Sequence, residues 1–555
     1  MSASAAPNVV LVITDDQGYG DLSCHGNAEI RTPNLDRLYG ESVRFTDFHV
    51  SPTCSPTRAA LMTGKYNNRV GVWHTIMGRS ILPGQEVTMA EAFQAGGYRT
   101  GIFGKWHLGD NFPSRPSDQG FETSLIHGGG GVGQLPDNWG NGYFDDTYWR
   151  DGKTEAFEGY CTDVWFDGAM EFIEDDPERP FFCYLSTNAP HGPYLVSDKY
   201  RDPYLEDGIE EPRASFYGMI ENIDDNMGRL LDRLDTLGIA DNTILIFMSD
   251  NGTAAGFRNG NGHNAGMRGT KGSAFDGGHR VPFFVRWLDG GIEGGRDVDA
   301  LTAHIDVMPT LLELCGLPSP KDVDGVSLSS LLNDNATARP GRVLVADSQR
   351  IEYPEQWRQS AVMTERWRLV NGKQLFDINA DPGQKTDVAS AHPDVVAKLR
   401  EDYLGWWDHI SPTFDDFPRI TIGGDAPDRA MLTSHDWHGE NVPWHQRHVL
   451  EGRPWNGTWK IEVAEAGEYQ VKLYRWPPHL KVPLAATEPG DMTARKVKAR
   501  LSIGEFEETV DAGDRATQVT FRVELDAGPH DLDTALIDEK GVGRGAYFVV
   551  IEDVE

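Results

Sequence analysis

The chain has 555 residues, of which 85 are acidic and 51 are basic, so its formal net charge at pH 7 is −34. With 39% apolar residues it can bury more than one hydrophobic core, which predicts two or three folded units and excludes a disordered chain. The acidic excess excludes a general nucleic-acid binder, because few cations are free to neutralise phosphates. A site for any anion must therefore gather its cations locally.

The first residues, 1–7, contain neither a basic segment nor an apolar run, and the run at 9–13 is too short to span a bilayer. We therefore predict no membrane contact. If an export signal has been removed, the expected location is the periplasm or the outside of the cell, and otherwise it is the cytoplasm. The sequence does not indicate an oligomeric state.

Short apolar runs typical of buried strands recur through the first two thirds of the chain, at 9–13, 98–103, 181–185, 243–248 and 281–287. Helical stretches at 89–95 and 215–237 lie between them, and Gly238 ends the second. Asp224 and Asp225 are expected on a solvated face of that longer helix. Strands that alternate with helices predict an α/β fold, with a mainly parallel sheet flanked by helices on both faces.

The pattern changes near residue 340. Hairpin-like runs at 360–369 and 373–378 and a helix at 393–407 predict a small α+β unit. Apolar and polar residues then alternate at 459–463, 469–474 and 519–525, as in half-exposed strands. We therefore predict an α/β domain at 1–335, a small α+β subdomain at 336–412, a turn-rich linker at 413–445 and a C-terminal all-β sandwich domain at 446–555.

Polar side chains follow the predicted strands at the points where those strands end: Asp15, Asp16, Lys105, His107, His191, Asp250 and Asn251. In open α/β sheets ligands bind at the carboxyl ends of the strands, so we expect these residues to meet in one site. The carboxylate pair Asp15-Asp16 and the Asp250-Asn251 pair supply oxygen ligands without Cys or His, which suits calcium or magnesium better than zinc, and we expect calcium.

Cys54 begins the segment Cys-Ser-Pro-Thr-Arg, in which Pro56 is placed to open a helix. Cys54 is therefore expected at a helix N-terminus, where unpaired backbone amides and the helix dipole favour an anion. Arg58, one turn along, adds a fixed charge suited to phosphate or sulfate.

At these residues the sequence resembles the type I sulfatases, the formylglycine-dependent branch of the alkaline phosphatase superfamily, and in particular bacterial arylsulfatase-like carbohydrate sulfatases. The segment Cys54 to Arg58 with Thr63 and Gly64 matches their modification signature. Other matching segments are 104–109, 12–18, 189–193, 249–252 and 270–272. The resemblance covers roughly residues 8 to 410 and implies an alkaline-phosphatase-like catalytic domain.

The resemblance implies that a formylglycine-generating modification system oxidises Cys54 to an aldehyde, formylglycine, whose hydrate is the nucleophile. One calcium ion would be bound by Asp15, Asp16, Asp250, Asn251 and the modified Cys54. Arg58 would steady the hydrate, and the sulfate would be surrounded by Lys105, His107, His191 and Lys271. We assign His107 to the hydrate and His191 with Lys271 to the departing alcohol. His127 is a candidate sulfate or sugar contact.

The expected activity is hydrolysis of a sulfate ester on a sulfated saccharide, with release of inorganic sulfate. The aromatic segment 138–149 offers rings on which a sugar could stack. One alternative is a phosphomonoester or phosphonate ester hydrolase of the same superfamily, because a similar pocket binds either tetrahedral anion. A second alternative is a non-catalytic glycan-binding protein that uses the terminal β domain.

Overall fold

The structure is a computed structural model that describes residues 6–333 and 341–554. Its larger unit is built on one ten-stranded sheet. The strand order is β13 (Arg296–Val298), β2 (Val43–Phe45), β12 (Phe283–Arg286), β9 (Thr243–Ser249), β1 (Asn8–Thr14), β8 (Phe181–Ser186), β4 (Arg99–Lys105), β5 (Thr123–His127), β6 (Thr147–Arg150) and β7 (Lys153–Ala156). Two small pairs lie outside it, β3 (Phe48–His49) with β14 (Thr302–Ala303) and β10 (Phe257–Arg258) with β11 (Asn261–Gly262).

The five central strands of this sheet, from β9 to β5, are parallel, as predicted. The run at 281–287 does enter the sheet as β12, but β12 is antiparallel to β9, and β6 is antiparallel to β5. An antiparallel strand buried on both faces has the same continuous apolar sequence as a parallel one, so periodicity could not reveal its direction.

Helices cover both faces of the large sheet. Successive side chains of β1 point to opposite faces, so they show which helices cover each face. Val9, Leu11 and Ile13 face the core under α2 (Cys54–Thr63), α3 (Met89–Ala95), α8 (Val307–Leu314) and α9 (Ser329–Leu332). Val10 and Val12 face the opposite core, under α1 (Pro33–Glu41), α4 (Cys161–Asp175) and α6 (Arg213–Leu237). Helix α5 (Asp198–Glu206) packs on α6. Each such side chain contributes about 1.5–3 kcal/mol of burial free energy.

None of the helices within residues 6–333 and 341–554 combines the length and apolar character that a bilayer crossing requires.

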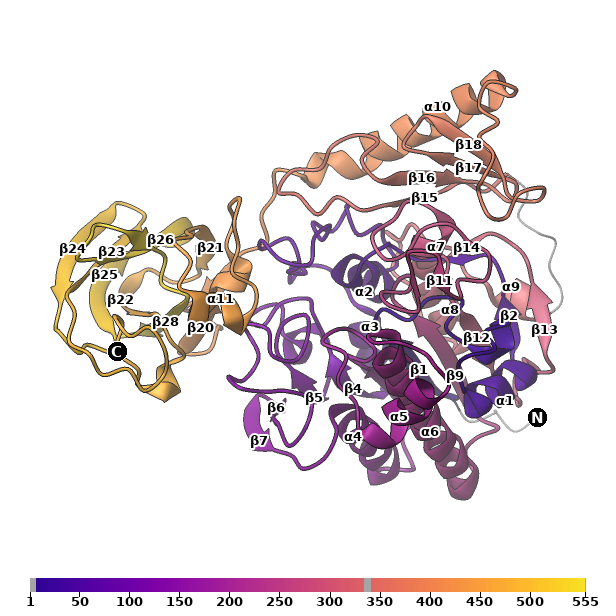
Figure 1. The fold of residues 1–555 in the computed structure, drawn as a ribbon, viewed down its shortest axis with the longest axis horizontal. Helices are drawn as coiled ribbons and strands as arrows, with labels where there is room; N and C mark the ends of the chain where they lie inside the picture. The colour runs from indigo at the N-terminus through magenta and orange to yellow at the C-terminus, as the bar shows by residue number, and fades with distance from the viewer. Residues whose placement is uncertain (1–5, 334–340, 555) are drawn as a thin grey trace.

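A smaller unit consists of a four-stranded antiparallel sheet and one long helix (Figure 1). The strands are β15 (Leu344–Asp347), β16 (Ser360–Met363), β17 (Trp367–Val370) and β18 (Gln374–Asp377), and the helix is α10 (Pro393–Ile410). One face of the sheet packs on Tyr403 and other residues of α10. The other face, with Leu344 and Met363, packs on Ala60 of α2. The predicted boundary at 335/336 lies outside the described residues.

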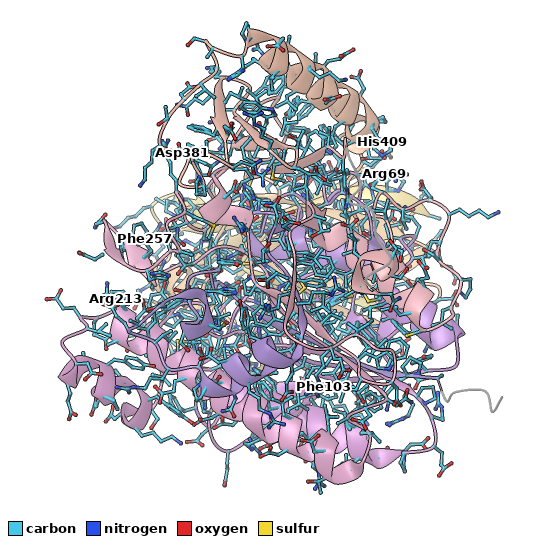
Figure 2. The ribbon with its side chains drawn as sticks, turned by 90° about the vertical axis from the view of Figure 1, so that its right-hand side faces the viewer. Arg69, Phe103, Arg213, Phe257, Asp381 and His409 are labelled. Carbon is cyan, nitrogen blue, oxygen red and sulfur yellow. The ribbon has the colours of Figure 1, made fainter. Side chains whose placement is uncertain are left out.

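Ion pairs join the small unit to the large one. Asp324 lies 3.1 Å from Arg69 Nη1 and 2.8 Å from His409 Nε2, and Figure 2 shows Arg69 and His409 close together at this boundary. Arg368 of β17 is fully buried and reaches Asp47 at 2.7 Å and Asp276, the first residue of α7 (Asp276–His279), at 3.3 Å.

The C-terminal unit is a β-sandwich that lies to one side of the large sheet (Figure 1). One sheet contains β19 (Ile420–Ile422), β21 (Thr458–Val463), β26 (Gly528–Asp538), β23 (Val497–Ile503) and β24 (Phe506–Ala512), with β27 (Gly543–Arg544) beside β26. The other contains β20 (Arg429–Thr433), β28 (Phe548–Asp553), β22 (Gly467–Tyr474) and β25 (Val519–Leu525).

The segment 413–445 is not the linker that the sequence suggested, because it supplies a strand to each sheet of the sandwich. Ile420 and Ile422 of β19 are buried and pair with β21, and β20 pairs with β28. A strand of three residues is too short to show a period of two, so only its distant partners define it. A short helix, α11 (Gln446–Glu451), follows this segment.

Candidate active site

The polar residues that follow the parallel strands meet at one edge of the large sheet. Asp15 and Asp16 follow β1, Lys105 ends β4, and Asp250 follows β9. Neighbouring parallel strands bring their carboxyl ends side by side, which is why residues so distant in sequence come together. Lys271 and Asp16, for example, are separated by 255 positions and form an ion pair.

Cys54 is the first residue of α2, a helix whose ten residues are all buried. Pro56 lies in the first turn, where a missing N–H leaves no hydrogen bond unmade. Cys54 Sγ is 3.3 Å from Lys271 Nζ and 4.0 Å from Asp16 Oδ1. Burial raises the pKa of the Cys54 thiol to about 12, since Lys105 and Lys271 offset only part of the desolvation. The unmodified thiol is therefore protonated at neutral pH and is a poor nucleophile.

Three buried carboxylates, those of Asp15, Asp16 and Asp250, place oxygens within 4.8 Å of one another. Burial and the nearby Asp15 raise the pKa of Asp250 to about 6, a repulsion that a bound cation would relieve. Asp15 Oδ1 and Asn251 Oδ1 are buried and accept no hydrogen bond from the residues that the structure describes. The amide nitrogen of Asn251 donates to Asp16 at 2.9 Å, which leaves its oxygen for another partner. This donor set fits a hard divalent cation.

Each of these carboxylates also has a cationic neighbour. Arg58, the neighbour of Asp250, is fully buried and also donates a hydrogen bond to the backbone carbonyl of Lys105 at 3.2 Å. Burial would raise the pKa of Asp16, but Lys271 and His191 outweigh that effect and keep it below its ordinary value. The site therefore holds its charges in compact pairs before an anion binds. The pairs are Lys105 Nζ to Asp15 Oδ2 at 2.7 Å, Lys271 Nζ to Asp16 Oδ1 at 2.5 Å and Arg58 Nη2 to Asp250 Oδ2 at 2.8 Å.

Two histidines lie beside Cys54, and burial keeps both neutral at pH 7. Burial lowers the pKa of His107 well below its ordinary value; its Nε2 donates to the carbonyl of Thr75 at 2.9 Å, which leaves Nδ1 without a partner among the described residues. Burial lowers the pKa of His191 to about 4. Its Nδ1 donates to the carbonyl of Gly192 at 2.6 Å, so Nε2, 3.8 Å from Asp16 Oδ2, is the nitrogen open to a ligand.

A cavity of about 140 Å³ opens at Cys54. Four of the predicted residues line it: Cys54, His107, His191 and Lys271. The predicted residues Asp15, Asp16, Arg58, Lys105, Asp250 and Asn251 are in contact with these four or with one another and lie behind the lining.

His127 also lies behind the wall of this cavity. Its side chain is buried, and Nδ1 donates to the carbonyl of Gly128 at 3.0 Å. Burial lowers the pKa of His127 to about 3. A contact between His127 and substrate stays a prediction, and the lining of the cavity does not favour it.

Several residues that line the cavity escaped the sequence analysis: Thr75, Ile76, Gly130, Gln134, Arg350 and Trp444. Gly130 belongs to the glycine-rich loop that ends at Gly133, and Gln134 follows that loop. Arg350 follows β15, and Trp444 precedes α11 in the segment that had been interpreted as a linker. No motif marks these two residues, because they reach the cavity only through the packing of the later units.

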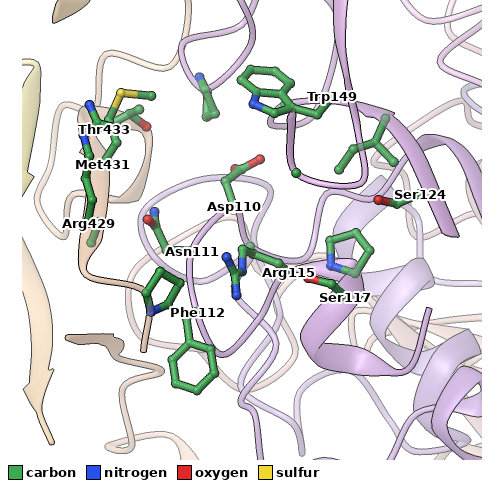
Figure 3. Close-up of a pocket in the computed structure, with 18 of the residues that line it drawn as sticks. Asp110, Asn111, Phe112, Arg115, Ser117, Ser124, Trp149, Arg429, Met431 and Thr433 are labelled. Carbon is green, nitrogen blue, oxygen red and sulfur yellow. The ribbon is translucent and has the colours of Figure 1, made fainter. Parts of the chain in front are cut away.

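A second cavity, of about 240 Å³, lies between the loop after β4 and strand β20 (Figure 3). Its lining includes Trp149, Arg115 and Arg429, and none of the predicted site residues. Trp149 therefore does not stack over the cavity at Cys54 as the sequence suggested. Trp139 packs against Trp476 of the sandwich, with 5.8 Å between the ring centroids. Its lining residues include no cysteine and no cluster of carboxylates.

The whole-chain comparisons agree with this geometry. A sulfatase family model matches residues 7–317, and a model of the C-terminal part of N-sulphoglucosamine sulphohydrolase matches residues 270–404. Human arylsulfatase A is 30% identical over 72% of this chain and 83% of its own length. The N-acetylgalactosamine-6-O-sulfatase of Bacteroides thetaiotaomicron is 31% identical over 72% of this chain and 92% of its own length.

Solved structures show the same fold. That of Ps i-CgsB in complex with a neocarrahexaose has a TM-score of 0.67 and 27% sequence identity, and covers 75% of this chain and 95% of its own. A phosphonate monoester hydrolase of Agrobacterium radiobacter, at 22% identity and a TM-score of 0.53, shares the fold alone. The family match spans more than half of the chain and coincides with the residues that meet at Cys54. The chain belongs to the sulfatase family and is a sulfuric ester hydrolase.

Proposed function

We propose that this enzyme hydrolyses a sulfate ester on a sulfated carbohydrate and releases inorganic sulfate and the free sugar alcohol. The observation that carries the proposal is the position of Cys54. It stands at the amino end of α2, 3.3 Å from the ammonium of Lys271 and beside a cluster of three carboxylates. A nucleophile that attacks a sulfate needs negative charge to be stabilised around it. A helix N-terminus, a cation and a metal-binding group supply this around one atom.

The proposed metal is a single Ca²⁺ ion held by Asp15, Asp16, Asp250 and Asn251, together with the oxidised side chain at position 54. The free oxygens of Asp15 and Asn251 support this assignment, as does the cluster of three carboxylates, Asp15, Asp16 and Asp250, whose oxygens lie within 4.8 Å of one another. The ion would supply Lewis-acid polarisation of the sulfate oxygens and of the nucleophile.

The proposed nucleophile requires oxidation of Cys54 by a formylglycine-generating system. A hydrated aldehyde at position 54 would supply one hydroxyl for attack on sulfur and a second whose proton can later be removed to release sulfate. Within this chain, Arg58 lies one turn along α2 from position 54 and is paired with Asp250, and the Nδ1 of His107 is available to accept that proton. The sequence suggested that Lys271 acts on the departing alcohol, but its Nζ lies 3.3 Å from Cys54 Sγ, so its proposed role is to stabilise negative charge at position 54.

His191 is proposed to protonate the departing alcohol. Its Nε2 lines the cavity and lies beside Asp16, whose charge favours the protonated ring. Burial, together with the nearby Lys271 and Lys105, outweighs Asp16 and lowers the pKa of His191 to about 4, and a bound sulfate dianion or monoester would raise it toward neutrality. A sugar alcohol is a poor leaving group and needs this proton.

A carbohydrate is proposed as substrate because named relatives act on sulfated sugars and because an indole, that of Trp444, forms part of the cavity wall. The rival phosphate or phosphonate ester remains chemically close, since the same cations fit either anion. A non-catalytic glycan binder is disfavoured, because every residue implied in turnover is present and all but His127 meet at one site.

The decisive experiment uses protein in which the modified fraction of residue 54 has been measured by peptide mass spectrometry. Rates of hydrolysis are then compared on matched sulfate and phosphate esters of the same sugar and of the same phenol. Sulfate turnover that rises in proportion to the modified fraction supports the proposal. A preference for the phosphate esters, or full turnover with Cys54 entirely a thiol, would refute it.

A further inference from the structure

The wall of the cavity that faces Cys54 includes two residues from the later units of the chain. Arg350 lies just after β15 of the small sheet, and Trp444 lies between β20 of the sandwich and α11. The two family models together end at residue 404, so Trp444 stands outside the part of the chain that they match. The cavity is therefore completed by a unit that the family models do not include.

Arg350 differs from the other cations near Cys54. Lys105, Lys271 and Arg58 are each paired with a carboxylate. The side chain of Arg350 is exposed, and the described residues offer it neither a hydrogen bond nor an ion pair. In a chain with a net charge of −34, an arginine left without a carboxylate at the mouth of an anion-binding cavity is available to bind a second anion.

The backbone of Arg350 gives independent support for a role of its side chain. Its φ is 37°, in the left-handed region that glycine adopts far more easily than arginine. Backbone strain of this kind persists where the surrounding structure requires it, and it is common at ligand sites.

Trp444 is fixed in place by hydrogen bonds to the large unit. Its carbonyl accepts from the amide of Leu135 at 3.0 Å, and the side chain of Gln446 donates to the carbonyls of Gln134 at 3.1 Å and Asn138 at 3.0 Å. The indole itself is only half-buried. Arg447 Cζ lies 5.5 Å from the centroid of the Trp444 ring, and the exposed part of the indole in the cavity wall provides a surface on which a sugar ring can pack.

The size of the cavity limits what can enter. Its volume of about 140 Å³ is below the roughly 300–1,000 Å³ of sites that enclose drug-sized ligands. The cavity therefore suits one sulfated ring that enters end-on, with the rest of the ligand outside.

We propose that Trp444 and Arg350 form a recognition wall for a sugar that carries a second negative charge, a carboxylate or another sulfate, besides the sulfate that is cleaved. Trp444 packs against the ring, and Arg350 binds the second anionic group. This inference rests on the proposed function and names the substrate class of the same site.

The test compares three substrates: an aryl sulfate, a monosaccharide 6-sulfate that has no other charged group, and glucosamine 2-N,6-O-disulfate. The variant Arg350→Gln should lower the ratio of kcat/KM for the disulfate to that for the neutral sugar sulfate by roughly 10- to 100-fold, mainly through KM. Trp444→Ala should lower kcat/KM for both sugars relative to the aryl sulfate, and Trp444→Phe should restore part of the loss. Arg515→Gln, which removes an exposed arginine of the sandwich that does not line the cavity, is the matched charge control and should leave both ratios unchanged.

Wild-type protein with modified Cys54 that hydrolyses none of the three esters would overturn the proposed function and this inference together. Normal aryl sulfate turnover with no preference for the disulfate, or ratios in Arg350→Gln equal to those of Arg515→Gln, would overturn the recognition wall alone. Equal losses of kcat/KM on all three substrates in Trp444→Ala, without rescue by Trp444→Phe, would disprove the role of the indole in the recognition wall. Unfolding midpoints of all variants, measured in parallel, report whether each is folded.

Discussion

The ammonium of Lys271 lies 3.3 Å from Cys54 Sγ, and the same Nζ lies 2.5 Å from Asp16 Oδ1. Asp16 thus orients a cation toward the atom at which negative charge must develop. Burial would lower the pKa of Lys271, but Asp16 and Cys54 outweigh that effect and raise it above its ordinary value, so the side chain stays charged. Cys54, the proposed nucleophile, and the cation beside it come from segments 217 positions apart in the sequence.

Replacement of Cys54 should separate catalysis from stability. Cys54→Ala should abolish sulfate release, because the aldehyde cannot form, yet cost only about 1 kcal/mol of unfolding free energy, since it removes one small group. Cys183→Ala, which removes an equally buried thiol on β8, is the control and should keep full activity. Steady-state rates and denaturant unfolding measure both effects. Residual turnover in Cys54→Ala comparable to that of Cys183→Ala would disprove the role of Cys54.

Removal of the metal should lower both activity and thermal stability. Without the cation, the three carboxylates within 4.8 Å of one another repel, and the oxygens of Asp15 and Asn251 lose their partner. Calcium at 100 times its Kd would contribute about 2.7 kcal/mol, which corresponds to several degrees in Tm. Scanning fluorimetry after chelation, followed by titration with calcium, magnesium or zinc, measures this contribution. Active protein that contains stoichiometric zinc and no calcium would contradict the assignment.

Two of the proposed ligands should differ in importance. Asp250→Ala removes a ligand and also leaves the fully buried Arg58 without its carboxylate, a loss of about 3–5 kcal/mol for a broken buried pair. Asn251→Ala removes a neutral ligand only, so it should weaken calcium binding with a smaller loss of stability. Calorimetric titration with calcium and unfolding in chelator measure the two effects separately. Equal stability losses in chelator would show that the Arg58 pair contributes nothing beyond metal binding.

His191→Ala should harm sugar-sulfate hydrolysis more than aryl-sulfate hydrolysis. A phenolate leaves without much acid assistance, whereas a sugar alkoxide must be protonated, and general acid catalysis typically contributes 10²–10⁴-fold. We expect a loss of roughly 10²-fold or more in kcat on the sugar and a clearly smaller loss on the aryl ester. His479→Ala, at an exposed site in the sandwich, serves as the control. Losses of the same size on both esters would remove His191 from the leaving-group role.

Arg368 should stabilise the junction between the small sheet and the large unit in a pH-dependent way. Burial would raise the pKa values of Asp47 and Asp276, but Arg368 outweighs it and holds both below the ordinary range. Depressed carboxyl pKa values mean that the stabilisation is complete above about pH 5 and is lost progressively as the pH falls below it. Arg368→Met should therefore cost about 3–5 kcal/mol at pH 7, and its deficit against wild type should shrink between pH 5 and pH 3.

The control for this prediction is Arg366→Met. Arg366 pairs with Asp377 at the surface, where such a pair contributes at most about 1 kcal/mol. Urea unfolding of both variants across this pH range provides the measurement. A deficit in Arg368→Met that stays constant from pH 7 to pH 3 would show that loss of packing, and not loss of the ion pairs, explains it.

The sequence predicted the parts of this protein that depend on local pattern. The strand ends at Asp15 and Asp250 and the proline-opened helix at Cys54 lie where we expected them, because strand periodicity and helix signals act within a few residues. Asp224 was expected to be solvated, yet its buried carboxylate accepts from the amide of Leu35 at 2.7 Å and caps α1. That role depends on a helix 189 positions away, which no local pattern encodes.

The same limit explains what was missed at the site. Arg350 and Trp444 line the cavity only because the small sheet and the sandwich pack against the large unit. Nothing near Trp444 in the sequence indicates a ligand, and the three-residue strand β19 that precedes it has its partner in β21, some forty positions further along. Long-range pairing of short strands is the information that a single sequence does not display.

The packing of the small sheet on α2 has a consequence for the order of events during synthesis. Cys54 is 2% exposed in the finished fold, and Ala60 of the same helix lies under Leu344 and Met363, which are translated almost three hundred codons later. A small ligand can reach Cys54 through the cavity that it lines, but an enzyme that has to hold the surrounding segment of α2 in its own active site has access to that segment only before the small sheet packs on it. The proposed oxidation of Cys54 is therefore expected on a nascent or incompletely folded chain, and protein that has folded with an unmodified thiol is expected to resist it.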